Sequence, residues 1–292
     1  REMTPAERLL WERLRGGPGT VPADEIARIA AHFVEPPYVE LARDSVNYHA
    51  ALADSRPFSR WASRNVAAHK RTGYAIVTLS LKKTGVPPGD LTADQMDTVA
   101  ELADRYSFGE LRVTHEQNLV LAHVLQADLH ALWGELRALG LATPNIGLLT
   151  DIVCCPGGDF CALANARSIP IAEAIQRRFD DLDYLHDLGD LELNISGCMN
   201  ACGHHHVGHI GILGVDKNGS EWYQVTLGGA QGSAASLGKV IGPSFAAEEM
   251  PDVIERIVDV YVERRLDGEP FIEAVRRLGI EPFRERVHAT AD

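Results

Sequence analysis

The sequence predicts an α+β protein in which a ferredoxin-like β-α-β-β-α half-domain is followed by an α/β domain. Between residues 74 and 139 the segments alternate in the order β-α-β-β-α, which is typical of one sheet covered by two helices. All five cysteines fall in the next region, between residues 154 and 202. We therefore expect a helical arm or linker over residues 1–66, the ferredoxin-like half-domain over 67–142 and the cysteine-bearing domain over 143–292.

Composition excludes several classes of protein. The chain has 292 residues, 45% of them hydrophobic and 24% charged, which are ordinary values for a globular protein. A net charge of -13 argues against nucleic acid as a partner, because phosphate backbones require clustered Lys and Arg. No apolar run approaches the roughly 20 residues that a membrane helix needs, so we expect a soluble, cytoplasmic protein. Because residue 1 is Arg rather than Met, we expect a piece of a longer protein or a trimmed chain.

The first 70 residues are predicted to be helical and irregular. Residues 6–14 and 23–33 have helical periodicity, and Glu35-Pro36-Pro37 breaks the second helix. A strand follows over residues 74–81. Lys82 and Lys83 come between this strand and a turn rich in Gly and Pro, and we interpret them as surface charge.

The rest of the half-domain consists of two helices around a pair of strands. Thr92-Ala93-Asp94-Gln95 matches a capping box and begins the first helix. Strands are expected over residues 111–115 and 119–124, and a helix over 128–139 should end at Gly140. The expected buried stripe of the first helix is Met96, Val99, Ala103 and Tyr106.

The cysteine-bearing domain is predicted to mix helices and strands. We expect a helix over residues 161–179 and a strand over 191–195. Two further strands, 208–215 and 221–227, should flank the Asn218-Gly219 turn. A helix over residues 248–265 closes the domain with one apolar face, formed by Val253, Ile254, Ile257, Val258 and Tyr261.

Four cysteines form two pairs with the spacing Cys155-x5-Cys161 and Cys198-x3-Cys202. Two such loops can converge on one metal centre, and thiolates are ligands for both iron-sulfur clusters and zinc. The five-residue spacing and the Pro-Gly-Gly in the first loop favour a cluster over the shorter zinc knuckles. A zinc site and buried, unliganded cysteines remain the alternatives.

Other residues near these loops have less specific interpretations. Cys154 adjoins the first ligand, and since consecutive residues rarely point the same way we interpret it as a small buried hydrophobe. His204, His205, His206 and His209 follow the second pair. We interpret them as solvent-facing residues or as support for a cofactor rather than as metal ligands.

Three segments resemble one family of redox enzymes. The stretch from Ile195 to Gly203, together with the upstream cysteine pair, is similar to the signature of siroheme-containing sulfite and nitrite reductases. Residues 108–119 resemble the strand-turn-strand of their second ferredoxin-like repeat. The Leu227-Gly228-Gly229 stretch resembles the segment after their cluster loops. The chain is thus identified as similar to the C-terminal half of this family, like the haemoprotein component of sulfite reductase.

The resemblance implies roles for individual residues. The thiolates of Cys155, Cys161, Cys198 and Cys202 would bind a [4Fe-4S] cluster, and Cys202 would also be the proximal ligand of a siroheme iron and the catalytic residue. Asn200 would lie in the loop around this bridge, and Gln117 would contact the siroheme. Arg112 would pair with a siroheme carboxylate. The alternatives are a loop-shaping Asn200, a turn-stabilising Gln117 and an ordinary strand-face Arg112.

The resemblance also implies an activity. We expect a six-electron reduction of sulfite to sulfide, or of nitrite to ammonia, with ferredoxin or a flavoprotein as electron donor. The basic substrate-binding residues of this family lie largely in the other half, so we expect that a missing N-terminal half or a complementary chain is required. The alternatives are a non-catalytic iron-sulfur electron-transfer or interaction module, a corrinoid-synthesis enzyme and a zinc-stabilised domain.

Overall fold

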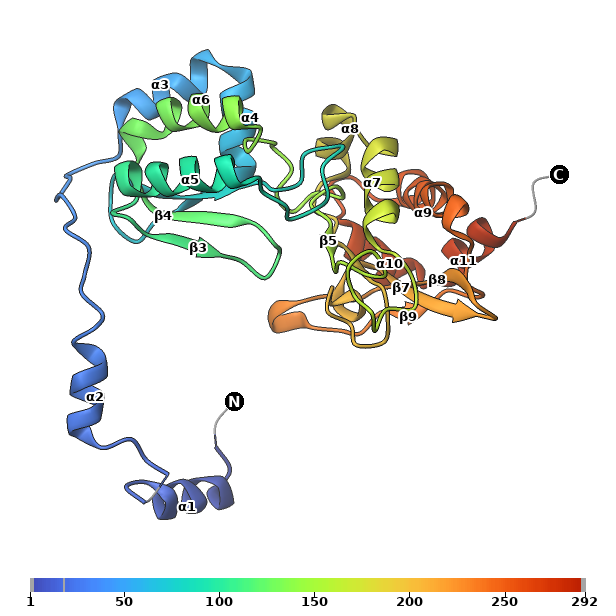
Figure 1. Ribbon diagram of the computed structural model, residues 1–292, viewed down its shortest axis with the longest axis horizontal. Coiled ribbons are helices and arrows are strands. Elements are labelled where there is room, and N and C mark those ends of the chain that lie inside the picture. The colour runs from blue at the N-terminus through green and yellow to red at the C-terminus, as the bar shows by residue number, and fades with distance from the viewer. Residues whose placement is uncertain (1–2, 18, 290–292) are drawn as a thin grey trace. The chain divides into compact units, whose positions relative to one another are not determined.

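The computed structural model describes residues 3–17 and 19–289, and it divides into two compact units, Arg1–Glu40 and Leu41–Asp292 (Figure 1). The first unit contains the helices α1 (Pro5–Leu14) and α2 (Ala23–Ala30), neither of which has a buried residue in the described part of the chain. In the described ranges we find no helix with the length and apolar content that crossing a bilayer requires.

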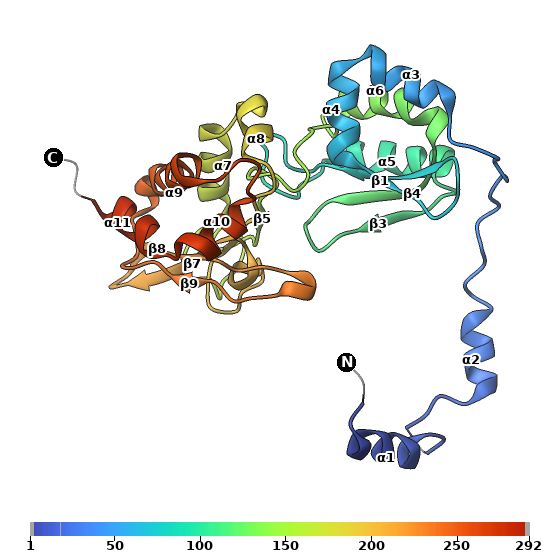
Figure 2. The same ribbon diagram turned by 180° about the vertical axis from the view of Figure 1, so that it is seen from behind.

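The second unit begins with a four-stranded antiparallel sheet. Its strands β1 (Val66–Ala68), β2 (Tyr74–Leu79), β3 (Leu111–Val113) and β4 (Leu119–Leu125) have the order β1-β2-β4-β3. The helices of this layer lie on one side of the sheet (Figures 1 and 2). The predicted β-α-β-β-α order is confirmed, with α5 (Ala93–Tyr106) after β2 and α6 (Leu129–Leu139) after β4.

The boundaries of the two covering helices follow their capping signals. The Thr92 hydroxyl accepts a hydrogen bond from Gln95 N–H, and the Gln95 side chain accepts one from Thr92 N–H, as in a capping box. Helix α6 ends at Gly140, which is left-handed at φ 74°. The predicted stripe of α5 is partly wrong: Val99 and Ala103 are buried, but the Met96 side chain is 59% exposed.

The expected arm over residues 1–66 differs from the structure in its second half. Helices α3 (Val46–Asp54) and α4 (Arg56–Asn65) pack against the ferredoxin-like layer, and β1 adds a strand to its sheet. Phe58 and Trp61 are completely or almost completely buried in the same core as the sheet. Aromatic residues of this size drive docking through the apolar area they bury. Because polar residues separate Phe58 and Trp61, the sequence did not indicate that α4 has a buried face.

A five-stranded mixed sheet forms the centre of the remaining chain. Its order is β5 (Val153–Cys154), β6 (Leu193–Ser196), β7 (Ile210–Lys217), β8 (Ser220–Leu227) and β9 (Lys239–Val240). The first three strands are parallel, and the last three are antiparallel. The predicted Asn218-Gly219 turn joins β7 and β8, and both turn residues have positive φ, as a type I′ turn requires.

Five helices share a hydrophobic core with this second sheet. They are α7 (Ile169–Arg178), α8 (Leu182–Leu188), α9 (Met250–Arg264), α10 (Phe271–Leu278) and α11 (Glu281–His288). The unit also contains four short 3₁₀ turns, which are η1 (Gln126–Asp128), η2 (His205–Val207), η3 (Gly232–Ala234) and η4 (Ala247–Glu249). The predicted apolar face of α9 is buried as expected. The predicted helix over 161–179 is wrong in its first half, because residues 161–168 form a loop that bonds to Gly197.

Candidate iron-sulfur site

Both cysteine loops leave the same edge of the mixed sheet. Cys155 follows β5 directly, and Cys198 comes two residues after the end of β6. These strands are parallel neighbours, with Cys154 opposite Ile195. Because parallel strands present their carboxyl ends at one edge, the topology brings the first cysteine of each pair to the same region.

Main-chain hydrogen bonds hold the two loops together. The Gly197 carbonyl accepts hydrogen bonds from Asn165 N–H at 2.8 Å and from Ala166 N–H at 3.1 Å. The Gly197 N–H donates to Cys155 Sγ at 3.1 Å. Amide donors to ligand sulfurs are characteristic of iron-sulfur sites, where they tune the reduction potential.

Two glycines make the close approach of these loops possible. A Cβ atom on Gly197 would lie 2.6 Å from the Ala166 carbonyl oxygen, and one on Gly203 would lie 1.9 Å from the Ile195 carbonyl oxygen. Both obstacles are backbone atoms, which cannot move aside as a flexible side chain could. Glycine is therefore required at both positions for this loop packing.

The second loop turns sharply between its cysteines. Ala201 and His204 adopt left-handed conformations at φ 55° and 54°, which is uncommon for residues with a side chain. Cys198 is buried and Cys202 is exposed, as are the neighbouring side chains of Met199 and Asn200. The loop thus presents Cys202 at the surface while Cys198 stays inside.

The four thiols fit the donor set of a cluster. Cys155 and Cys198 are buried, Cys161 is half-buried and Cys202 is exposed. Within residues 3–17 and 19–289, no three His, Cys, Asp or Glu side chains lie close enough to hold a single metal ion. A four-iron cluster has a different requirement, because each thiolate binds its own iron.

Cys154 belongs to the core rather than to the loops. Its side chain packs in the main hydrophobic cluster of the mixed sheet, and Sγ donates to the Cys155 carbonyl at 3.2 Å. Burial raises the pKa of the Cys154 thiol well above its ordinary value. A protonated, buried thiol of this kind is a structural residue.

The histidines after the second pair have separate environments. His205 is buried and stacks on His206 at a centroid distance of 3.9 Å, and burial lowers the pKa of His205 to about 4. His209 Nδ1 accepts from Glu192 N–H at 3.2 Å. The His204 carbonyl accepts from Asn194 Nδ2 at 3.1 Å. These contacts support the loop and the sheet.

Gln117 lies against the first cysteine loop. Its Nε2 donates to the Cys154 carbonyl at 2.7 Å, and its Oε1 accepts from Cys154 N–H at 2.9 Å. Arg112 is exposed on β3 and forms an ion pair with Glu110. The structure therefore brings Gln117 to the cysteine region, whereas Arg112 is paired within the ferredoxin-like layer.

The prediction that Lys82 and Lys83 are both surface charges is wrong for Lys82. The Lys82 side chain is completely buried, and only Lys83 is exposed. Lys82 Nζ donates to the carbonyls of Glu116 and Ile152. A lysine between a strand and a turn is normally solvated, so the sequence pattern carried no signal for this burial.

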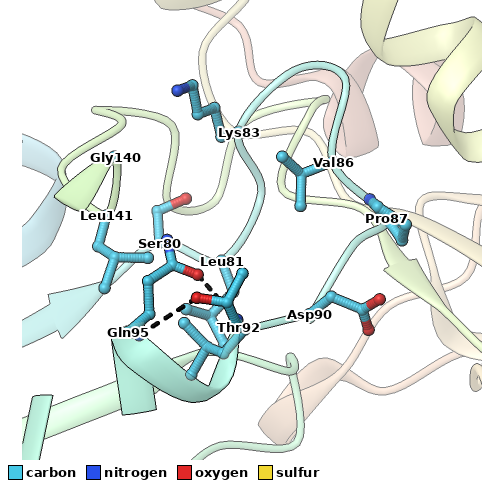
Figure 3. A pocket seen from close by; sticks show the side chains of 11 residues that line it. Ser80, Leu81, Lys83, Val86, Pro87, Asp90, Thr92, Gln95, Gly140 and Leu141 are labelled. Carbon is cyan, nitrogen blue, oxygen red and sulfur yellow. Dashed lines mark hydrogen bonds between the residues drawn. The ribbon is translucent and has the colours of Figure 1, made fainter. Parts of the chain in front are cut away.

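Two of the cavities in the described part of the chain border the start of α5 or the first cysteine loop. One, of about 310 Å³, lies at the start of α5, where Figure 3 shows Thr92 and Gln95 at one end and Lys83 at the other. All its lining residues come from the ferredoxin-like layer. A larger cavity of about 510 Å³ is lined by residues of the ferredoxin-like layer, among them Gln117, and by residues of the cysteine-bearing part, among them Cys154 and the exposed Phe160. This second cavity adjoins the first cysteine loop.

Comparisons with known proteins agree with this geometry. A family model described as "Nitrite and sulphite reductase 4Fe-4S domain" matches residues 147–292, and one described as "Nitrite/Sulfite reductase ferredoxin-like half domain" matches residues 72–139. The chain belongs to the nitrite and sulfite reductase family. The two cofactors expected from the sequence, a [4Fe-4S] cluster and a siroheme, are those of this family, and both expectations are confirmed at that level.

Curated members of the family are similar over most of this chain. The ferredoxin–nitrite reductase of Synechococcus elongatus is 32% identical over 223 residues, which are 72% of this chain and 41% of that protein. The sulfite reductase [ferredoxin] of Mycobacterium tuberculosis is 31% identical over 209 residues, 68% of this chain and 38% of that protein. The chain thus spans about two fifths of the length of these relatives.

Solved structures show the same fold. The Mycobacterium tuberculosis NirA protein matches with a TM-score of 0.62 at 28% identity, covering 75% of this chain and 41% of that one. Dissimilatory sulfite reductase I matches with a TM-score of 0.62 at 13% identity, covering 100% of this chain and 92% of that one. The second match concerns the fold alone.

Proposed function

We propose that this chain supplies the cluster-bearing half of a siroheme reductase that converts sulfite to sulfide or nitrite to ammonia. The observation that carries the proposal is the convergence of the two cysteine loops at one sheet edge, with the Gly197 amide on Cys155 Sγ. The names of the similar proteins, which include nitrite and sulfite reductases, support the reaction class.

The four loop cysteines have different roles in this proposal. Cys155, Cys161 and Cys198 hold the cluster. Cys202 holds it as well and also provides the sulfur that the siroheme iron shares, a role that its exposure at the surface supports. When bound, the two cofactors supply low-potential electrons in single steps to the oxyanion.

Other predicted residues act around the cysteines. Gln117 fixes the main chain of Cys154 and thereby orients the start of the first loop. Asn200 is exposed beside Cys202 and borders the same surface. Arg112 would have to exchange Glu110 for a siroheme carboxylate, and we propose this exchange as its role.

Substrate binding requires charge that this chain lacks overall. With a net charge of -13, an anionic substrate must be drawn by a local basic surface. Because the chain spans about two fifths of its relatives, we propose that a complementary half supplies this surface and that a ferredoxin, as in the names of the relatives, supplies electrons.

The visible spectrum of protein purified without oxygen tests the proposal. We expect a siroheme absorption band together with a cluster shoulder. Cys202→Ser should lose the siroheme signature, whereas Cys154→Ser should keep both features. A cluster shoulder alone in the wild type would indicate an electron-transfer module, and equal damage from both substitutions would refute the assignment of Cys202. Turnover of sulfite and of nitrite with a reduced dye and the complementary half then ranks the two substrates.

A further inference from the structure

A buried ammonium lies between the ferredoxin-like layer and the first cysteine loop. Lys82 Nζ donates hydrogen bonds to the Glu116 carbonyl at 2.8 Å and to the Ile152 carbonyl at 2.7 Å. The third partner is Asp151, whose Oδ1 lies 3.8 Å from the ammonium. The Lys82 side chain has no exposed surface, so the two carbonyls and the Asp151 carboxylate take the place of the water that would otherwise solvate its charge.

The two carbonyls belong to the segments that meet at the cysteine site. Glu116 precedes Gln117. The side-chain amide of Gln117 forms hydrogen bonds with the N–H and the carbonyl of Cys154. Ile152 precedes β5, which leads directly into Cys155. One ammonium therefore joins the turn that contains Gln117 to the strand that immediately precedes Cys155, the first proposed ligand.

Hydrogen bonds also hold Asp151, the carboxylate beside Lys82, in position. The Asp151 carboxylate accepts hydrogen bonds from Asn118 Nδ2 at 2.9 Å and from Gly147 N–H at 3.0 Å. Asn118 Oδ1 in turn accepts from Leu81 N–H at 3.0 Å, next to Lys82. A satisfied buried network of this kind selects one arrangement of the segments it joins.

A lysine is a costly way to fill a buried space. Burying an ammonium loses its hydration, and an apolar side chain of similar volume often gives equal or greater stability. An apolar residue could not hold two carbonyls at fixed positions. The directional hydrogen bonds therefore point to a role in positioning rather than in packing.

We propose that Lys82 is a positioning residue of the cluster site, which holds the entry to the first cysteine loop in register with Gln117. This inference rests on the proposed cluster at the four cysteines. Lys82 acts through Ile152 and Glu116 and touches neither the ligands nor the substrate. Its loss would leave the loop entry in several arrangements and weaken retention of the cluster.

The test compares variants of the whole chain, purified without oxygen, by their iron and sulfide content, the EPR spectrum of the reduced cluster and the rate of cluster loss in air. Lys82→Met leaves Asp151 buried without its cation, and this variant could fail to fold. The double variant Lys82→Met/Asp151→Asn avoids this uncompensated charge while still removing the ammonium that donates to both carbonyls. We expect the double variant to bind the cluster with a broadened EPR signal and to lose it roughly tenfold faster than the wild type.

Two controls separate positioning from general destabilisation. Lys83→Met removes the exposed neighbouring charge and should match the wild type. Leu132→Ala makes a cavity in the core of the ferredoxin-like layer, and it should lower the thermal midpoint without changing the EPR signal. A double variant with the wild-type EPR signal and rate of loss would overturn the role of Lys82 alone. Wild-type protein without iron and sulfide would instead overturn the proposed cluster itself.

Discussion

The side-chain amide of Gln117 forms hydrogen bonds with both the N–H and the carbonyl of Cys154. Its Nε2 donates to the Cys154 carbonyl at 2.7 Å, and its Oε1 accepts from the Cys154 N–H at 2.9 Å. Gln117 itself adopts a left-handed conformation at φ 59°, which the β3–β4 turn imposes on it. These hydrogen bonds thus join the ferredoxin-like layer to the residue immediately before Cys155, the first proposed cluster ligand.

Replacement of Gln117 tests this connection. Gln117→Ala leaves a buried N–H and a buried carbonyl without their partners, so we expect a loss of about 1–3 kcal/mol in the free energy of unfolding and a lower cluster content. Urea unfolding and iron analysis measure the two effects. Gln117→Glu keeps an acceptor but loses the donor and should be affected as well. His115→Ala, an exposed change in the same turn, serves as the control, and equal stability of all variants would contradict the connection.

Gly203 tests the close packing of the cysteine loops. A methyl group there would lie 1.9 Å from the Ile195 carbonyl oxygen, so Gly203→Ala should displace the loop that carries Cys198 and Cys202 and abolish cluster binding. Gly134, in α6, has no atom within 4 Å of an added Cβ. Gly134→Ala should therefore keep the cluster and stabilise the helix by up to about 1 kcal/mol. A cluster retained in Gly203→Ala, by iron analysis, would show that the packing is less restrictive.

His205 predicts a dependence of stability on pH. Burial lowers its pKa from 6.5 to about 4, so between these values the unfolded chain binds a proton that the folded chain does not. Protonation of the unfolded chain has no effect above pH 6.5, and the free energy of unfolding falls as the pH drops from 6.5 toward 4, by on the order of 3 kcal/mol. Urea unfolding at pH 7.5 and 4.5 should show a smaller difference for His205→Leu than for the wild type. The exposed control His32→Leu should keep the wild-type difference, and identical differences in all three proteins would contradict the prediction.

The aromatic residues of α4 are predicted to stabilise the core of the ferredoxin-like layer. Phe58 is completely buried against Trp61 and Trp133, so Phe58→Ala should cost about 3–5 kcal/mol in the free energy of unfolding. Leu10→Ala, on the exposed surface of α1, should change it by less than about 0.5 kcal/mol. Chemical denaturation compares the two variants. A small effect of Phe58→Ala would contradict the packing of α4 in the core of the ferredoxin-like layer.

The sequence predicted elements whose signals are local. The Thr92–Gln95 capping box, the Asn218-Gly219 turn and the apolar face of α9 are each set by residues close in the chain, and all three are as expected. The cysteine spacing predicted two loops that meet, and hydrogen bonds from the first loop to Gly197 join them, but the assignment of the four thiols to one cluster stays a prediction.

Features that depend on distant residues could not be predicted. The loop over residues 161–168 is not a helix because the carbonyl of Gly197, which is distant in the sequence, accepts hydrogen bonds from Asn165 N–H and Ala166 N–H. Lys82 is buried because carbonyls from two other segments meet it. The helix α4 carries large aromatic residues among polar ones, and only the sheet and α6 show that these face a core. Tertiary contacts overrode the local pattern in each case.

The assignment of the four thiols to one [4Fe-4S] cluster is tested most directly by the iron and acid-labile sulfide content of protein purified without oxygen. We expect about four iron and four sulfide per chain in the wild type and in Cys154→Ser, and a large loss of both in Cys198→Ser. Stoichiometric zinc without iron, or equal losses in the two variants, would contradict the assignment.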